Sequence, residues 1–101
     1  MATWIRQPQE QEGTYLFGGW FGCTVSVQEE LSSDEIKAIY NEIKEAVKVN
    51  NGLDYLQVFK DENGRKLYFI DSINREAIES ELYDINDPNV NYCMLMFAEE
   101  Y

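Results

Sequence analysis

Apolar and polar positions alternate along residues 20 to 28, which is the first regular pattern in the chain. The apolar side chains fall at every second position: Phe21, Cys23, Val25 and Val27. A period of two places successive side chains on opposite faces of an extended chain. The segment therefore predicts a strand with one face on a core.

A helical spacing follows between residues 36 and 47. The apolar residues recur at intervals of three and four: Ile36, Ile39, Tyr40, Ile43, Ala46 and Val47. This spacing forms one apolar stripe on an amphipathic helix. Ser32 or Ser33 can cap its first amide groups, and Asn50-Asn51-Gly52 suits its C-terminus.

Two short runs rich in Tyr, Leu, Val, Phe and Ile come next, at 53–60 and 65–71. The connection between them ends in Asn63-Gly64, and both residue types tolerate a positive φ. These runs predict a β-hairpin.

The last part of the chain predicts a second, shorter helix and a final strand. Helical spacing over 73–82 places four apolar residues on one side: Ile73, Ala77, Ile78 and Leu82. A turn-rich connection follows over 83–91, and 92–98 is a nearly continuous apolar run typical of a strand.

The order strand, helix, strand, strand, helix, strand is that of a ferredoxin-like βαββαβ fold. This α+β fold has an antiparallel sheet with two helices on one face. Its first and last strands are neighbours, so Cys23 and Cys93 should lie on adjacent strands, with Val25 and Leu95 facing the helices. We expect one domain over 1–101, with an N-terminal strand or arm and loop over 1–13 and a body over 14–101. The N-terminal strand can join the sheet at an edge or form a hairpin of its own.

Charge narrows the choice of partners. Nineteen acidic and eight basic residues give a net charge of −11, and there is no histidine. Such a field repels nucleic acid, because binding to phosphates relies on Lys and Arg. The same field attracts basic proteins, although net charge serves solubility equally well.

The residues needed for catalysis and metal binding are mostly missing. Without histidine there is no Ser-His-Asp or Cys-His arrangement and no zinc site of the usual spacing. The acidic run 84–89 fails as a calcium loop, because Pro88 occupies a ligand position and Leu95 the closing position. We therefore expect no enzyme, no metal and no cofactor. The two cysteines in apolar runs and the lack of a signal peptide or membrane span favour a soluble cytoplasmic protein.

One acidic stretch is the first candidate binding surface. Between residues 71 and 87, Arg75 is the single basic residue among six acids: Asp71, Glu76, Glu79, Glu81, Asp84 and Asp87. If 73–82 is helical, Glu76 and Glu79 share an outer stripe with Tyr83 close by. An aromatic inside an anionic surface can anchor a basic protein. The alternative is a plain solvated helix face.

The second candidate is the sheet face turned away from the helices. If Val25 and Leu95 face inward, Thr24, Ser26 and three strand residues lie on the open side: Tyr92, Met94 and Met96. We expect hairpin aromatics there too, from among Tyr55, Phe59, Tyr68 and Phe69. A large apolar patch of this kind usually marks an interface. Dimerisation, or coverage by the arm through Trp4 and Ile5, fits it better than binding of bases.

Two functions follow as hypotheses. The first is a non-enzymatic module that inhibits or escorts a basic, nucleic-acid-handling protein. In size, charge and absent catalytic groups the chain resembles immunity proteins, nucleic-acid mimics and phage-encoded inhibitors of defence nucleases, including anti-CRISPR proteins. The second is a ferredoxin-like homodimer that binds a small molecule, or an interaction subunit, using its apolar sheet face.

Overall fold

A single mixed sheet organises the protein. The computed structural model describes residues 3–101, so the first two residues of the predicted arm 1–13 lie outside it. The strands are β1 (Ile5–Arg6), β2 (Trp20–Cys23), β3 (Leu56–Lys60), β4 (Lys66–Asp71) and β5 (Tyr92–Phe97). Their order across the sheet is β1-β3-β4-β5-β2. Neighbours are antiparallel except β2 and β5, which run parallel. The predicted α+β class is confirmed.

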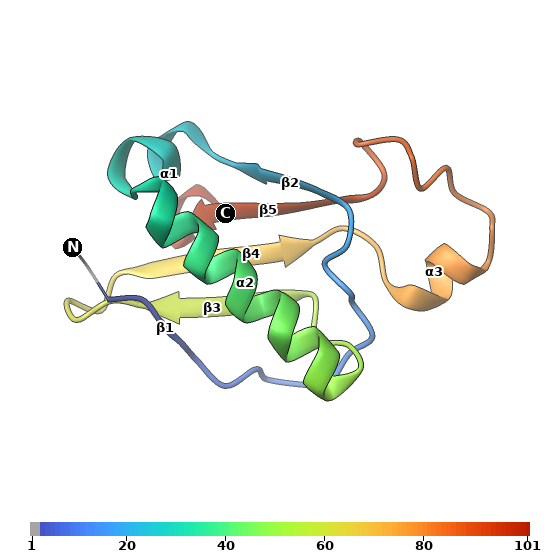
Figure 1. Ribbon diagram of the computed structural model, residues 1–101, viewed down its shortest axis with the longest axis horizontal. Coiled ribbons are helices and arrows are strands. Elements are labelled where there is room, and N and C mark those ends of the chain that lie inside the picture. The colour runs from blue at the N-terminus through green and yellow to red at the C-terminus, as the bar shows by residue number, and fades with distance from the viewer. Residues whose placement is uncertain (1–2) are drawn as a thin grey trace.

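The helices are α1 (Val25–Glu30), α2 (Ser33–Asn50) and α3 (Arg75–Glu79), followed by a final 3-10 turn, η1 (Ala98–Glu100). Figure 1 shows α2 lying diagonally across one face of the sheet, whereas α3 stands beyond the ends of the strands. The prediction of two helices on one face is therefore corrected, since only α2 crosses it. The second predicted helix is also shorter than 73–82.

The predicted strand 20–28 ends at Cys23, and this is the main local error of the sequence reading. The Thr24 hydroxyl accepts the Val27 N–H at 3.4 Å and caps α1. Val25, expected to face the core, is 69% exposed, while Val27 is fully buried. A Thr within an alternating segment is also a good N-cap, and here capping outweighs the period-2 pattern.

The ferredoxin-like strand order is not confirmed. The first strand of the body, β2, is neighbour to the last, as predicted, but it runs parallel to β5 and lies at the edge. The place beside β4 belongs to β5, which is apolar on both of its faces. Such a strand is suited to the interior of a sheet, whereas β2 has four residues, one of them Gly22.

Helix α2 and the hairpin match their predictions. Ser32 and Glu35 form a reciprocal capping box, and Asn51 ends the helix in the left-handed conformation. In the hairpin turn, the Asp61 carboxylate accepts the N–H groups of Asn63 and Arg65. Gly64, between these two residues, has a φ of 81°.

The core lies between α2 and the sheet. The fully buried side chains from the helix, the strands and their connections include Phe17, Ile43, Leu53, Phe59, Leu67, Phe69 and Leu95. Phe17 and Phe69 meet edge to face, with ring centroids 5.0 Å apart. Phe59 and Phe69 are thus core residues, and the expectation that they lie on the open side is wrong for them.

The N-terminal strand joins the sheet at an edge, beside β3. Trp4 lies 6.4 Å from Phe97, measured between ring centroids, and packs against the core on the α2 side. The prediction that Trp4 covers the opposite face of the sheet is therefore wrong. The polar segment after β1 is held to the body, because the Gln9 side-chain oxygen accepts the Asp54 N–H at 3.0 Å.

Candidate protein-binding surfaces

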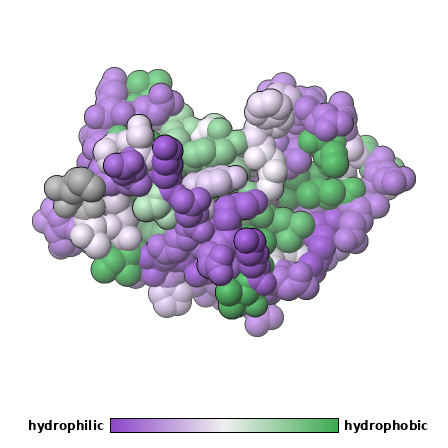
Figure 2. All heavy atoms as spheres, viewed as in Figure 1, coloured by the Kyte–Doolittle hydropathy of each residue, from purple (hydrophilic) through white to green (hydrophobic). Residues whose placement is uncertain are grey.

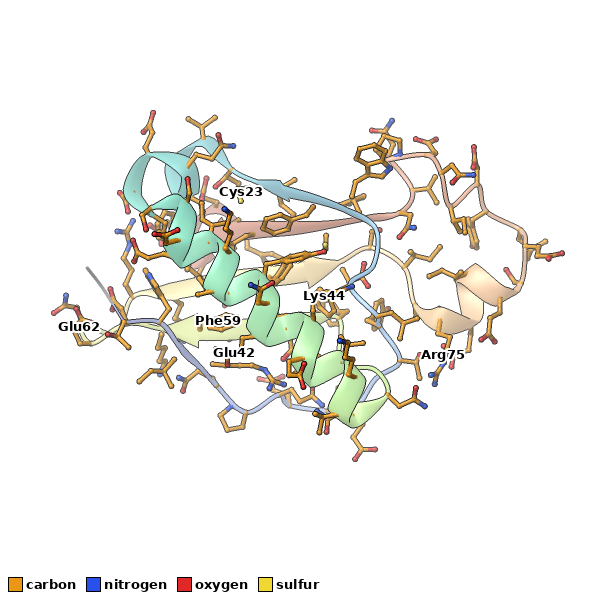
Figure 3. All side chains as sticks on the ribbon, in the orientation of Figure 1. Cys23, Glu42, Lys44, Phe59, Glu62 and Arg75 are labelled. Carbon is orange, nitrogen blue, oxygen red and sulfur yellow. The ribbon has the colours of Figure 1, made fainter. Side chains whose placement is uncertain are left out.

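Residues 75–91, which we call the acidic lobe, project from the ends of the strands and comprise α3 and the loop leading to β5 (Figure 1). The lobe is fastened to the body at its start. The Arg75 N–H donates to the Thr14 carbonyl at 2.9 Å, and its guanidinium donates to the Asn51 side chain at 3.0 Å. Figure 3 shows Arg75 reaching from α3 towards the C-terminal end of α2. The lobe therefore has a defined position on the body.

Glu76 belongs to this attachment rather than to a free acidic surface. Its carboxylate accepts a hydrogen bond from the Thr14 hydroxyl, which lowers the pKa of Glu76. A carboxylate held in this way is less available to a partner than its exposed neighbours.

The returning loop is held by its own hydrogen bonds. The Ser72 hydroxyl donates to the Val90 carbonyl at 2.7 Å, and the Asn91 amide donates to the Ile85 carbonyl at 3.0 Å. Asp84 and Asp87 each accept the N–H two residues ahead, at 3.0 and 2.9 Å. These contacts close successive turns, so the two acids shape the loop as well as charging it.

The tip of the lobe exposes large apolar side chains among carboxylates. Leu82 is 81% exposed and Tyr83 is 53% exposed. Glu79, Glu81 and Asp84 surround them in sequence and are also exposed. Figure 2 shows hydrophobic residues interspersed with hydrophilic ones on this side of the molecule. The predicted combination of an aromatic with acids is therefore present on one protruding segment.

Asp71 is the exception among the predicted acidic residues, because it is buried. Its side chain is 4% exposed, and one carboxylate oxygen accepts the Phe17 N–H at 2.9 Å. The other oxygen has no hydrogen-bond partner. Burial raises the pKa of Asp71, against the opposing effect of the backbone N–H groups. The sequence held a signal of this, since Asp71 shares the parity of Leu67 and Phe69, which face the core.

The sheet face opposite α2, called the open face below, carries the second set of predicted residues. Tyr92, Met94 and Met96 alternate with the buried positions of β5, as predicted. Met96 pairs with Tyr68, and Met94 pairs with Ile70. On β3, Val58 is the partner of Tyr68 and Leu56 is the partner of Ile70, so two rows of apolar side chains cross the three strands. All but Tyr92 are half-buried, and Tyr92 is slightly more exposed.

Two lysines also lie on the open face, which sequence reasoning missed. Lys60 and Lys66 are register partners at one end of it. Neither takes part in the ion pairs found within residues 3–101, which join Arg65 to Glu30 and Glu99. Both line a groove of about 540 Å³ together with Val58, Tyr68 and the segment 7–11. Their even positions in the hairpin were the available signal, because Phe59 and Leu67 occupy the odd, core-facing ones.

The two cysteines lie where burial disfavours a nucleophilic thiolate. They are free thiols on adjacent strands, as expected. Burial, together with the nearby Asp71 carboxylate, raises the pKa of Cys93 to about 12. Burial also raises the pKa of Cys23. Both shifts disfavour the reactive thiolate.

Neither a metal site, a membrane span nor a known relative narrows the function further. Residues 3–101 contain no group of three or more Cys, Asp or Glu side chains arranged to hold a metal ion. Within the same residues, no helix has the length and apolarity needed to cross a membrane. No family model, curated protein or solved structure matches the chain.

Proposed function

We propose that the protein is a non-enzymatic binding module that inhibits or escorts a basic, nucleic-acid-handling protein through its acidic lobe. The observation that supports this is the exposed lobe tip, where Leu82 and Tyr83 stand among Glu79, Glu81 and Asp84. Apolar and aromatic side chains in the middle of a contact supply affinity, and charges around them supply orientation and rate.

The charge of the whole protein supports the same partner class. A net charge of −11 on 101 residues attracts a basic surface before contact. A surface that binds nucleic acid is basic because it must neutralise phosphates. Carboxylates placed on such a surface would compete with the nucleic acid for the same Lys and Arg side chains. The proposed action is therefore that of an inhibitor, immunity protein or nucleic-acid mimic, the group to which anti-CRISPR proteins also belong.

The test compares two charge reversals of equal size. One variant carries Glu79→Lys, Glu81→Lys and Asp84→Lys in the lobe. Its control carries Glu29→Lys, Glu42→Lys and Glu45→Lys on α1 and α2, where these residues are also exposed. The partner is first captured from host lysate at low and high salt, then purified, and association rates are measured with both variants.

We expect the lobe reversal to slow association about tenfold or more, because local charges near the contact dominate electrostatic steering. The control should change it much less, although its net charge is the same. Binding should also weaken as salt rises, since salt screens charges beyond about 10 Å. Equal rates for the two variants, or binding unaffected by salt, would contradict the proposal.

A second candidate function is binding through the open face, supported by the half-buried rows ending at Met94 and Met96 and by the groove beside Lys60 and Lys66. The volume of this groove, about 540 Å³, falls in the range of small-molecule sites. In this case the protein would act as a small-molecule binder or an interaction subunit. The same experiment separates the two candidates, because binding at the open face would survive reversal of the lobe charges.

A further inference from the structure

Strand β2 forms an edge of the sheet with unpaired backbone groups. The N–H groups of Trp20 and Thr24 donate to carbonyls next to or within β5, at 3.0 and 3.1 Å. The backbone groups of successive residues in a strand point to opposite edges. Because those of Trp20 and Thr24 point to β5, the N–H and C=O groups of Phe21 and Cys23 point to the outer edge. The Cys23 carbonyl accepts the Gln28 side chain at 3.0 Å. Phe21 is thus the residue of β2 whose two backbone groups are both directed outward without such a cover.

Strand β2 is short and Gln28 covers its Cys23 carbonyl, but the edge lacks the other usual devices that prevent strand addition. Proteins protect an edge with charged side chains, proline, bulges or a covering element. Residues 13–28 contain no charged residue and no proline, although the chain as a whole carries −11. Two aromatic side chains are exposed on β2, Trp20 at 62% and Phe21 at 36%. The edge is therefore open and apolar.

A hollow lies on each side of this edge. Towards the open face, a hollow of about 460 Å³ is bordered by Trp20, Gly22, Pro88, Tyr92 and Met94, among others. Towards α2, one of about 440 Å³ is bordered by Gly19, Phe21, Tyr40, Ile85 and Asn91, among others. Neither lining includes a charged residue. Strand addition combines main-chain hydrogen bonds with pockets for alternate side chains, and both are present here.

We propose that β2 pairs with β2 of a second copy of the chain, in antiparallel orientation, to form a continuous sheet of ten strands. The two-fold axis would pass between the two Phe21 residues, whose outward N–H and C=O groups then bond to each other in both directions. In this register Trp20 lies opposite Gly22 of the second copy. Gly22 has no side chain, and the end of the Met94 side chain lies over it, with its methyl carbon 3.1 Å from where a Cβ atom would stand. The indole would therefore pack against the Met94 thioether on that face.

Charge selects a second copy as the occupant. Two molecules of −11 repel each other over most of their surfaces, and contact is least costly where carboxylates are missing. Strand β2 is such a place, and it is itself an extended, uncharged segment that carries the aromatic side chains the hollows can accept. A basic partner would have no comparable reason to prefer a neutral edge.

The first test measures self-association by sedimentation equilibrium over a wide concentration range. We expect a monomer–dimer equilibrium whose dissociation constant rises at least tenfold in Trp20→Lys, because two buried ammonium groups would enter a neutral interface. The control is Val49→Lys on α2, since Val49 is 74% exposed and distant from β2 in the chain. Circular dichroism and thermal melting establish that both variants fold. A monomer at all concentrations, or a dimer unaffected by Trp20→Lys, would overturn the proposal.

The second test uses the register and does not depend on the fold tolerating a lysine. Cα atoms of a hydrogen-bonded antiparallel pair lie about 5.5 Å apart, within the range that a disulfide spans. Cys93 is the register partner of residue 21 within one molecule, so its thiol must be removed as well as that of Cys23. Phe21→Cys in a Cys23→Ser, Cys93→Ala background should therefore crosslink to a dimer when treated with diamide, and reductant should reverse it. Val49→Cys in the same background is the control. A dimer that fails to crosslink at residue 21, or that is lost in Met96→Lys instead, would place the contact elsewhere.

Discussion

The body and the acidic lobe are stabilised by different kinds of interaction, although both belong to one short chain. In the body, α2 and the sheet enclose fully buried apolar side chains such as Phe59, Phe69 and Leu95. In the lobe, α3 contains no buried residue, and the hydrogen bonds of polar side chains close its turns. A segment with little buried apolar area can keep carboxylates and apolar groups exposed for a partner. The difference separates what stabilises the fold from what is available for binding.

The largest predicted effect tests this difference directly. Phe69→Ala should lower the free energy of unfolding by about 3–5 kcal/mol, because it leaves a cavity where Phe17, Phe21 and Phe69 pack together. Leu82→Ala removes a large apolar side chain from the lobe and should stay within about 0.5 kcal/mol of the wild type. Urea denaturation monitored by circular dichroism measures both values.

Similar losses for the two variants would contradict this difference between body and lobe, since they would mean that Leu82 is packed as a core residue is. If Phe69→Ala does not fold, Phe69→Leu should show a smaller loss in the same direction and keep the test informative.

A pair of adjacent glycines tests the junction between the regions. A Cβ atom on Gly19 would lie 2.5 Å from the backbone oxygen of Asn91, at the end of the lobe. A Cβ on Gly18 would meet nothing closer than the Lys44 side-chain nitrogen, at 4.0 Å. We expect Gly19→Ala to cost about 1–3 kcal/mol and Gly18→Ala to be neutral or slightly stabilising.

Urea denaturation gives the stabilities of the glycine variants, and hydrogen exchange of residues 84–91 shows where the strain appears. Faster exchange in the lobe of Gly19→Ala, with unchanged exchange in the core, would show that the strain is confined to the lobe. Equal stability of the two variants would show that the lobe can move away from β2 at little cost.

The sequence predicted best where local and tertiary signals agree. Helix α2 has a capping residue, an apolar stripe and a C-terminal Asn-Gly that all indicate the same boundaries. The hairpin has a turn sequence that fits its register. The α+β class and the neighbouring positions of β2 and β5 followed from these elements.

The sequence failed where one pattern serves two structures. Apolar residues at 21, 23, 25 and 27 fit a strand, but Thr24 caps a helix in the middle of them. Strand order also depends on which strand has two apolar faces, and here β5 takes the interior place. Among the candidate site residues, the exposed lobe acids could be predicted from local charge. Predicting the burial of Asp71 requires knowing which residues of β4 face the core. Predicting that Lys60 and Lys66 lie together on the open face requires the pairing register of β3 and β4.

The smallest predicted effect concerns Asp71, the last residue of β4, where the body meets the lobe. Its pKa is raised by burial above the value of about 3.9 expected in the unfolded chain. The folded state then holds the proton more tightly, so stability from this group is greatest at low pH and falls as pH rises from about 4 through the raised pKa. Asp71→Asn keeps an oxygen for the Phe17 N–H and cannot ionise. We expect this variant to be more stable than the wild type by about 1 kcal/mol at pH 7, with the gap closing towards pH 4.

Urea denaturation at several pH values measures this gap. Glu45→Gln on the exposed face of α2 is the control for the loss of one negative charge, because protonation of other acids also relieves repulsion at low pH. A gap that stays constant with pH, or that equals the control, would mean that folding does not change the pKa of Asp71, and a gap that reverses sign as pH rises would mean that Asp71 is stabilised as a carboxylate in the folded state. In that case the nearby Lys44 ammonium, whose charge opposes the effect of burial, would hold Asp71 ionised. The junction between body and lobe would then depend on a buried charge pair rather than on a proton.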